Sequence, residues 1–215
     1  MNHFPFSKTN LKTLYSSGKS LQDISTHLRC SVHKVIYWMR KYGIVRRSRS
    51  DAMYVKLNPN GDPFKIKKSF SRKDLFLFGL GLGIYWGEGT KASQHAVRVS
   101  NSDPNMVKSF IRFLENICGV RRAKMRYSIV CFNDSNPAEV AFFWAQALGI
   151  RSNQFGKIVQ VPPQGKGNYR RKSETGVCTV TVSNIKLKSW IMERLKELSE
   201  GRLDSLVVKQ TLGKG

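Results

Sequence analysis

The chain has little negative charge. Only 14 of its 215 residues are Asp or Glu, against 37 Lys and Arg, which gives a formal net charge of +23. So large an excess of positive charge predicts a polyanionic partner, and nucleic acid is the commonest one. A membrane surface fits less well, because no basic amphipathic helix stands alone in the sequence. A ribosomal or purely electrostatic binder stays open as the simpler alternative.

The chain also lacks paired cysteines and long apolar runs. No cysteine forms a C-x-x-C pair or lies at zinc-binding spacing from a histidine, and the four are Cys30, Cys118, Cys131 and Cys178. We therefore expect reduced, mostly buried thiols in a cytoplasmic protein. The longest apolar run, residues 75–86, is too short to span a bilayer, and residues 1–10 contain no signal-peptide core. The expectation is a soluble, DNA-associated protein with no membrane partner.

Residues 1–50 have the pattern of three short helices. Apolar residues recur at helical spacing over 11–17, 21–28 and 32–42. A short second helix, a tight turn and a longer third helix resemble the helix-turn-helix of resolvase-like and sigma-factor-like DNA-binding domains. The resemblance implies that the third helix contacts DNA through exposed polar side chains, namely His33, Lys34, Tyr37 and Arg40. A three-helix packing module with a solvated basic face is the alternative.

A basic segment and a turn-rich segment follow. The sequence RRSRS, residues 46–50, predicts an arm in which Arg46, Arg47 and Arg49 contact a DNA backbone or minor groove, with a charged linker as the alternative. Asn-Pro, Asn-Gly and Asp-Pro within residues 56–64 predict turns. We therefore expect a helix-turn-helix domain over 1–50, a basic linker over 51–70, a second domain over 71–200 and a tail over 201–215.

The stretch FGLGLGIYWGEGTK, residues 78–91, combines two features that weaken a helix. Gly79, Gly83 and Gly87 recur every fourth residue, and each costs roughly 0.5–1 kcal/mol relative to alanine. Glu88 then places a carboxylate at the negative end of the helix dipole, and Gly89 is expected to end the helix in a left-handed conformation. The glycines allow two such helices to approach closely, which would bring two carboxylates together around a hard divalent cation.

The nine residues GLGIYWGEG, 81–89, resemble the signature of the LAGLIDADG homing endonucleases. Gly83, Gly87, Glu88 and Gly89 match its key positions; Trp86 replaces the first of its two acids, and Gly81 and Leu82 depart at its opening. The resemblance implies that Glu88 is the catalytic acid and binds Mg²⁺. With one signature per chain, it also implies a homodimer whose interface contains Gly79, Gly83 and Gly87 and whose double-stranded DNA target is pseudo-palindromic.

The rest of the second domain predicts alternating strands and helices. We expect strands near 96–101, 124–132 and 176–183, and helices over 104–117, 137–150 and 185–200. The predicted fold class is α+β: a three-helix domain, then an αββαββα-like saddle with an antiparallel sheet, as the family resemblance implies. The helix at 137–150 has no clear place in that saddle.

The resemblance also implies accessory residues. Lys186, with Lys188 as the competing candidate, matches the region where the family carries a lysine near the scissile phosphate, and Asn101 is a candidate for organising water. Lys186 can equally be an ordinary lysine at a helix start. Basic residues expected to contact DNA from the sheet and from a loop over 162–176 are Lys91, Arg98, Lys124, Arg126, Lys166, Arg170, Arg171 and Lys172.

Three functions are compatible with these patterns. The first is a site-specific endonuclease of a mobile element that uses Mg²⁺ to cut both strands of a long DNA target. The second is a non-catalytic transcriptional regulator on the same type of fold. The third is a maturase that binds RNA with the same basic surface.

Overall fold

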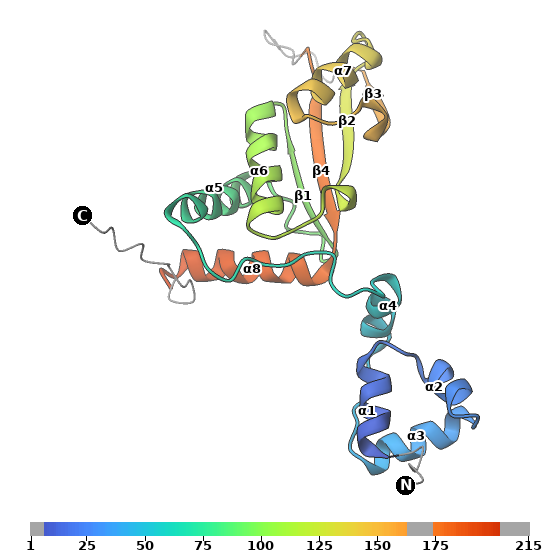
Figure 1. The fold of residues 1–215 in the computed structure, drawn as a ribbon. Helices are drawn as coiled ribbons and strands as arrows, with labels where there is room; N and C mark the ends of the chain where they lie inside the picture. Colours follow the sequence, from blue (N-terminus) through green and yellow to red (C-terminus); the bar gives the residue numbers. More distant parts are fainter. Residues whose placement is uncertain (1–6, 163–173, 203–215) are drawn as a thin grey trace. The chain divides into compact units, whose positions relative to one another are not determined.

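A computed structural model describes residues 7–162 and 174–202. The chain divides into two compact units, Met1–Pro63 and Phe64–Gly215. The described residues contain eight α-helices and a four-stranded sheet, which confirms the α+β class (Figure 1). None of the described helices has the length and apolar character needed to cross a membrane.

The first unit is built on three helices, as predicted. They are α1 (Lys8–Ser16), α2 (Leu21–His27) and α3 (Val32–Lys41). A serine caps the start of each helix by accepting a backbone hydrogen bond, which satisfies an otherwise unpaired N–H group. The helices enclose a small core in which Leu11, Ile24, Val35 and Met39 are buried. The core fixes which face of α3 remains exposed.

A fourth helix, α4 (Arg49–Leu57), begins where the sequence predicted an arm and a linker. The segment before it is held to α1 by Arg47, whose backbone N–H donates to the Tyr15 hydroxyl at 2.6 Å. The Arg47 guanidinium lies 4.0 Å from the centre of the Tyr15 ring and donates to the Lys19 carbonyl at 3.1 Å. Arg47 therefore serves the packing of the first unit, which differs from the expected free arm.

The expected linker 51–70 is divided between the two units. Phe64 and Ile66 pack against the core of the second unit. The backbone N–H groups of Lys65 and Lys67 donate to the carbonyls of Cys118 and Ile117 at 3.1 and 2.9 Å. Residues 64–70 are thus an integral part of the second unit.

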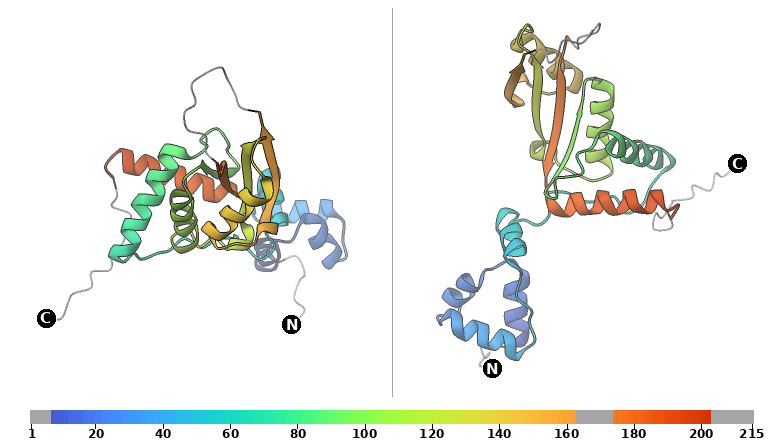
Figure 2. Two further views of the ribbon diagram at one scale, coloured as in Figure 1. Left: turned by 90° about the horizontal axis from the view of Figure 1, so that it is seen from above. Right: turned by 180° about the vertical axis from the view of Figure 1, so that it is seen from behind.

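The second unit packs helices against one face of its sheet (Figures 1 and 2). Its helices are α5 (Arg72–Glu88), α6 (Pro104–Asn116), α7 (Pro137–Leu148) and α8 (Ile185–Ser199), with short 3-10 turns at Arg122–Lys124 and Ser152–Gln154. Its strands are β1 (Ala96–Asn101), β2 (Arg126–Phe132), β3 (Phe155–Val161) and β4 (Val177–Ser183). The predicted strands and helices of this region are therefore present, and β3 is additional.

The sheet is mixed, so the predicted antiparallel sheet is wrong. The strand order is β1-β4-β2-β3; β4 pairs antiparallel with β1 and β2, whereas β3 pairs parallel with β2. Parallel neighbours need a long crossover connection, usually a helix. Helix α7 is that crossover, which explains the helix that the saddle scheme could not place.

Alternation along the strands separates two faces of the sheet. Residues such as Val99, Ile129 and Val180 point into the core beneath the helices and are fully buried. The alternate residues form what we call the open face, and all are exposed or half-buried: Arg98, Ser100, Arg126, Ser128, Val130, Val159, Val177, Thr179 and Thr181. One face thus packs into the core, while the other is exposed to solvent.

Helix α5 is fixed at its start and in its middle. Ser71 and Asp74 form a capping box, and Asp74 also pairs with Lys67 at 2.8 Å, which lowers the pKa of this carboxyl to about 2. In the middle, a Cβ added to Gly81 would lie 2.1 Å from the Phe113 ring of α6. Only glycine permits this close approach of the two helices. By contrast, a Cβ at Gly79 would meet nothing within 4 Å.

We expect opposite effects from the same substitution at these two glycines. Gly81→Ala should lower the free energy of unfolding by about 1–3 kcal/mol, because it overpacks α5 against α6. Gly79→Ala should raise it by roughly 0.5–1 kcal/mol through helix propensity. Urea unfolding of dilute protein measures both, and equal shifts would contradict the close contact at Gly81.

Candidate nucleic-acid interface

Glu88 is the last residue of α5, and its side chain is exposed. The chain then runs along β1: Gly89 forms an isolated bridge with Val99, and the Thr90 N–H donates to the Arg98 carbonyl at 3.0 Å. Gly89 has an extended backbone with φ of −77°, so the predicted left-handed terminator is wrong. This connection anchors Glu88 beside the strand that carries Arg98.

Two lysines lie at the C-terminal end of α5. Lys188 is buried, and its Nζ donates to the Tyr85 hydroxyl at 2.5 Å and to the Thr90 carbonyl at 2.8 Å. Lys91 donates to the Trp86 carbonyl in the last turn. Both ammonium groups offset the negative end of the helix dipole, which makes a carboxylate at Glu88 less costly.

Burial shifts the pKa values of Lys188 and Tyr85. It lowers the pKa of the Lys188 ammonium, and the positive charge of Lys91 lowers it further. It also raises the pKa of Tyr85 to about 12. The Tyr85 hydroxyl donates to the Thr90 carbonyl at 2.9 Å, so both side chains hold the segment that follows Glu88.

The accessory candidates occupy different environments. Lys186 is exposed in the first turn of α8, whereas its competitor Lys188 reaches the end of α5. The amide oxygen of Asn101 accepts from the Asp103 N–H at 2.8 Å, in the turn that precedes α6. Sequence reasoning could not separate the two lysines, because only tertiary packing buries Lys188.

One chain brings a single candidate carboxylate to this site. Among residues 7–162 and 174–202, no group of three or more His, Cys, Asp or Glu side chains is arranged to hold a metal ion. An ion at Glu88 would therefore need oxygen ligands from elsewhere, such as the same carboxylate of a second copy.

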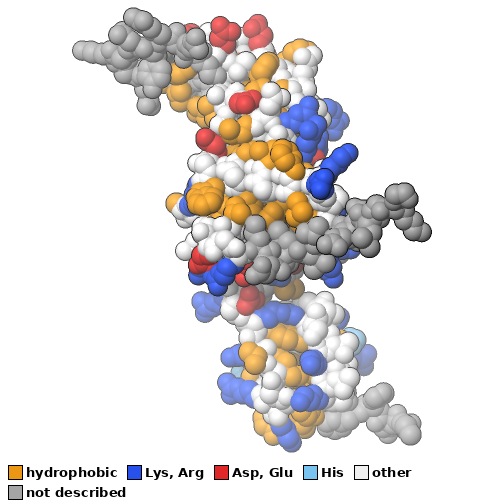
Figure 3. All heavy atoms as spheres, turned by 90° about the vertical axis from the view of Figure 1, so that its left-hand side faces the viewer, with side chains coloured by type: hydrophobic (Ala, Val, Ile, Leu, Met, Phe, Trp, Pro, Cys, Tyr) orange, Lys and Arg blue, Asp and Glu red, His pale blue; other side chains and the backbone are white. Residues whose placement is uncertain are grey.

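The glycine-bearing face of α5 is exposed. A Cβ at Gly79, Gly83 or Gly87 would meet no atom within 4 Å. The same face carries large apolar side chains that are far from buried: Phe76 is 74% exposed and Trp86 is 50% exposed. Figure 3 shows hydrophobic side chains gathered on this side of the second unit. An exposed apolar surface of this kind is typical of an interaction site.

The open face of the sheet carries basic and hydroxyl-bearing side chains beside its valines. None of the four strands contains Asp or Glu. Arg98 and Arg126, both predicted to contact DNA, lie on either side of Thr181 in the strand register. Lys124 is exposed just before β2, and Lys157 on β3 is an exposed basic residue that was missed because β3 was not predicted.

In the first unit, α3 presents the predicted polar face. His33, Lys34, Tyr37 and Arg40 are exposed, while Val35 and Met39 point into the core. Arg46 and Arg49 are also exposed, unlike Arg47. The predicted loop residues Lys166, Arg170, Arg171 and Lys172 lie outside the described residues.

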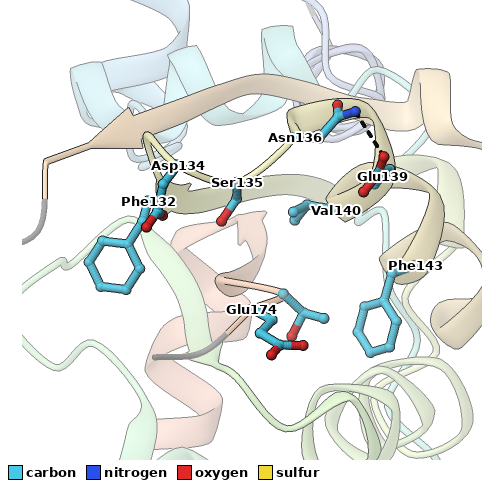
Figure 4. A pocket seen from close by; sticks show the side chains of 9 residues that line it. Phe132, Asp134, Ser135, Asn136, Glu139, Val140, Phe143 and Glu174 are labelled. Carbon is cyan, nitrogen blue, oxygen red and sulfur yellow. Dashed lines mark hydrogen bonds between the residues drawn. The ribbon is translucent and has the colours of Figure 1, made fainter. Parts of the chain in front are cut away.

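An acidic hollow of about 450 Å³ lies where β2 leads into α7 (Figure 4). Among the described residues, its lining contains three acids and no base: Phe132, Asp134, Ser135, Asn136, Glu139, Val140, Phe143, Glu174 and Thr175. The Trp144 indole donates to the Thr175 carbonyl at 2.7 Å and holds one wall in place. Three carboxylates make this described lining electronegative.

Comparison of the chain with protein-family models, curated proteins and solved structures found no match.

The two lysines of α8 should differ in their effect on stability. Lys188→Ala should lower the free energy of unfolding by about 2 kcal/mol, because it removes a buried stem and two hydrogen bonds. Lys186→Ala should change it by less than about 0.5 kcal/mol, as expected for an exposed side chain. Urea unfolding makes the comparison, and a small shift for both would show that Lys188 does not secure the end of α5.

Proposed function

We propose that the chain is a site-specific DNA endonuclease that cuts both strands in a metal-dependent reaction. The observation that carries the proposal is the position of Glu88: an exposed carboxylate is fixed at the edge of a sheet whose open face is free of acids. A carboxylate beside a phosphate-binding surface raises the free energy of DNA binding, so it needs a chemical reason to be there.

In this proposal a second copy of the chain covers the exposed face of α5. Gly79, Gly83 and Gly87 allow close approach of the two helices, while Phe76 and Trp86 supply apolar area. A two-fold axis along this contact brings together two Glu88 carboxylates and implies a pseudo-palindromic target.

The donor set of such a dimer fits a hard divalent cation such as Mg²⁺. The two Glu88 carboxylates would hold the ion, because oxygen ligands are those that Mg²⁺ prefers. When bound, the ion supplies positive charge that stabilises the attacking and leaving oxygens of phosphodiester hydrolysis. Lys188 keeps the segment after Glu88 in position through the Thr90 carbonyl.

The first unit extends the DNA contact in this proposal. Its α3 offers aromatic, imidazole and cationic groups on one face, a combination suited to base edges and phosphates. A second candidate function is a regulator that binds the same DNA without cutting it. The observation that favours it is that the described residues contain no group of three or more His, Cys, Asp or Glu side chains arranged to hold a metal ion.

Cleavage of a randomised-site plasmid library by purified full-length protein tests the enzyme. Wild type with Mg²⁺ should give double-strand cuts at one sequence. Glu88→Gln should retain binding and lose cutting, because the neutral amide is a weaker metal ligand. Glu139→Gln removes an acid in the hollow and is the matched control, which should cut normally. Sequence-specific binding without cuts would favour the regulator.

Replacing Tyr37 and Arg40 together by alanine tests the first unit. We expect about a tenfold or greater loss of affinity for the selected DNA and a shorter footprint, because a polar base-reading surface is removed. Replacement of Lys8 and Lys12 on α1 changes charge by two without touching α3 and serves as the control. Unchanged affinity in the first variant would show that α3 does not contact DNA.

A further inference from the structure

The open face is divided into rows of one chemical kind. Strand register places Arg98, Thr181 and Arg126 in one row, which we call the arginine row. The next row, two residues along, consists of hydroxyls: Ser100, Thr179 and Ser128. Ser100 and Thr179 are hydrogen-bonded at 2.8 Å, which turns two polar groups toward each other.

The third row consists of three valines. Val130 pairs with Val177 on one side and with Val159 on the other, so their side chains form an apolar row across β4, β2 and β3. Val130 is 39% exposed and Val159 is 42% exposed. Val130 points away from the core, because its sequence neighbours Ile129 and Cys131 are buried, and the strand register places Val159 on the same face as Val130. The valine row is therefore a surface feature that core packing does not explain.

The valine row has a defined place relative to charge. Val177 lies four residues before Thr181 on β4, and at about 3.3 Å per residue this is about 13 Å from the arginine row. Phe132, two residues beyond Val130, already lines the acidic hollow. The apolar row thus lies between a cationic row and a hollow whose described lining is acidic.

The major groove offers one apolar group, the C5-methyl of thymine, and β-strands can enter this groove. DNA rises about 3.4 Å per base pair, so 13 Å along β4 corresponds to about four base pairs. Arginine pairs with guanine or phosphate, whereas hydroxyl side chains can hydrogen-bond to more than one kind of base. Aliphatic side chains pack on thymine methyl groups.

We propose that Val130, Val159 and Val177 determine sequence specificity by contacting thymine methyl groups about four base pairs from the position read by Arg98 and Arg126. The inference rests on the proposed DNA binding of the second unit, but it does not require cleavage. The occupant of the valine row is the major groove of duplex DNA, because the adjoining arginine row is cationic and the four strands carry no acid.

The experiment uses full-length protein and a DNA duplex selected from a random library for tight binding. Each thymine is replaced in turn by deoxyuridine, which removes only the methyl group. We expect a loss of about three- to fivefold in wild-type affinity at one to three adjacent positions, the value for one buried methyl. The Val130→Ser, Val159→Ser double variant should bind thymine and deoxyuridine duplexes equally.

A matched control keeps the result specific. Ser128→Ala changes the neighbouring hydroxyl row and should retain the deoxyuridine effect. Arg98→Ala should weaken the base preference at positions about four base pairs from the thymines whose replacement by deoxyuridine lowers the affinity. Thermal unfolding verifies that each variant is folded.

The possible failures are distinguishable. DNA binding with no deoxyuridine effect, or with the same effect in the valine double variant, overturns the inference and leaves the proposed DNA binding intact. Tighter binding of RNA, whose uracils have no methyl group, also overturns it. If the protein retains no DNA sequence from the random library, the proposed function is overturned as well.

Discussion

The contact between Gly81 of α5 and Phe113 of α6 is the constraint on which the second unit depends. It brings two helices closer than any side chain at position 81 would allow. This close packing turns the opposite face of α5, with its other glycines, away from the core. It also directs the end of α5 to β1, where Gly89 bridges to Val99 and Glu88 becomes fixed beside the open face. The location of the candidate acid is thus a consequence of helix packing.

Electrostatics then divides the surface of this unit. Lysines 91 and 188 offset the helix dipole and the nearby carboxylate, while the strands carry cations and hydroxyls. Acids gather at the hollow between β2 and α7. In a chain with net charge +23, the described surface of this unit thus separates a basic sheet face from an acidic hollow.

Local patterns in the sequence predicted the elements whose signals are local. The residues of helix α5 are strongly apolar and those of β4 alternate strictly, so a helix and a strand were expected there. Strand β3 was missed because its sequence, FGKIVQV, has an early glycine and a weak alternation, and because its parallel pairing depends on a distant strand. The packing role of Arg47 and the burial of Lys188 also depend on distant partners, Tyr15 and Tyr85.

The strand order has a consequence for how the chain folds. Strand β4 occupies an interior position in the sheet but is the last of the four strands in the chain. Strand β1 has no neighbouring strand until β4 has been synthesised. Pairing of β1 with β4 closes a loop of about 80 residues, as the 79-residue separation of Ser100 and Thr179 shows. Loop closure on this scale is slow, so folding of the sheet must await nearly the whole unit. A fragment that ends before residue 177 would lack β4, so its hydrophobic helices would have no complete sheet to pack against. Such fragments are expected to aggregate.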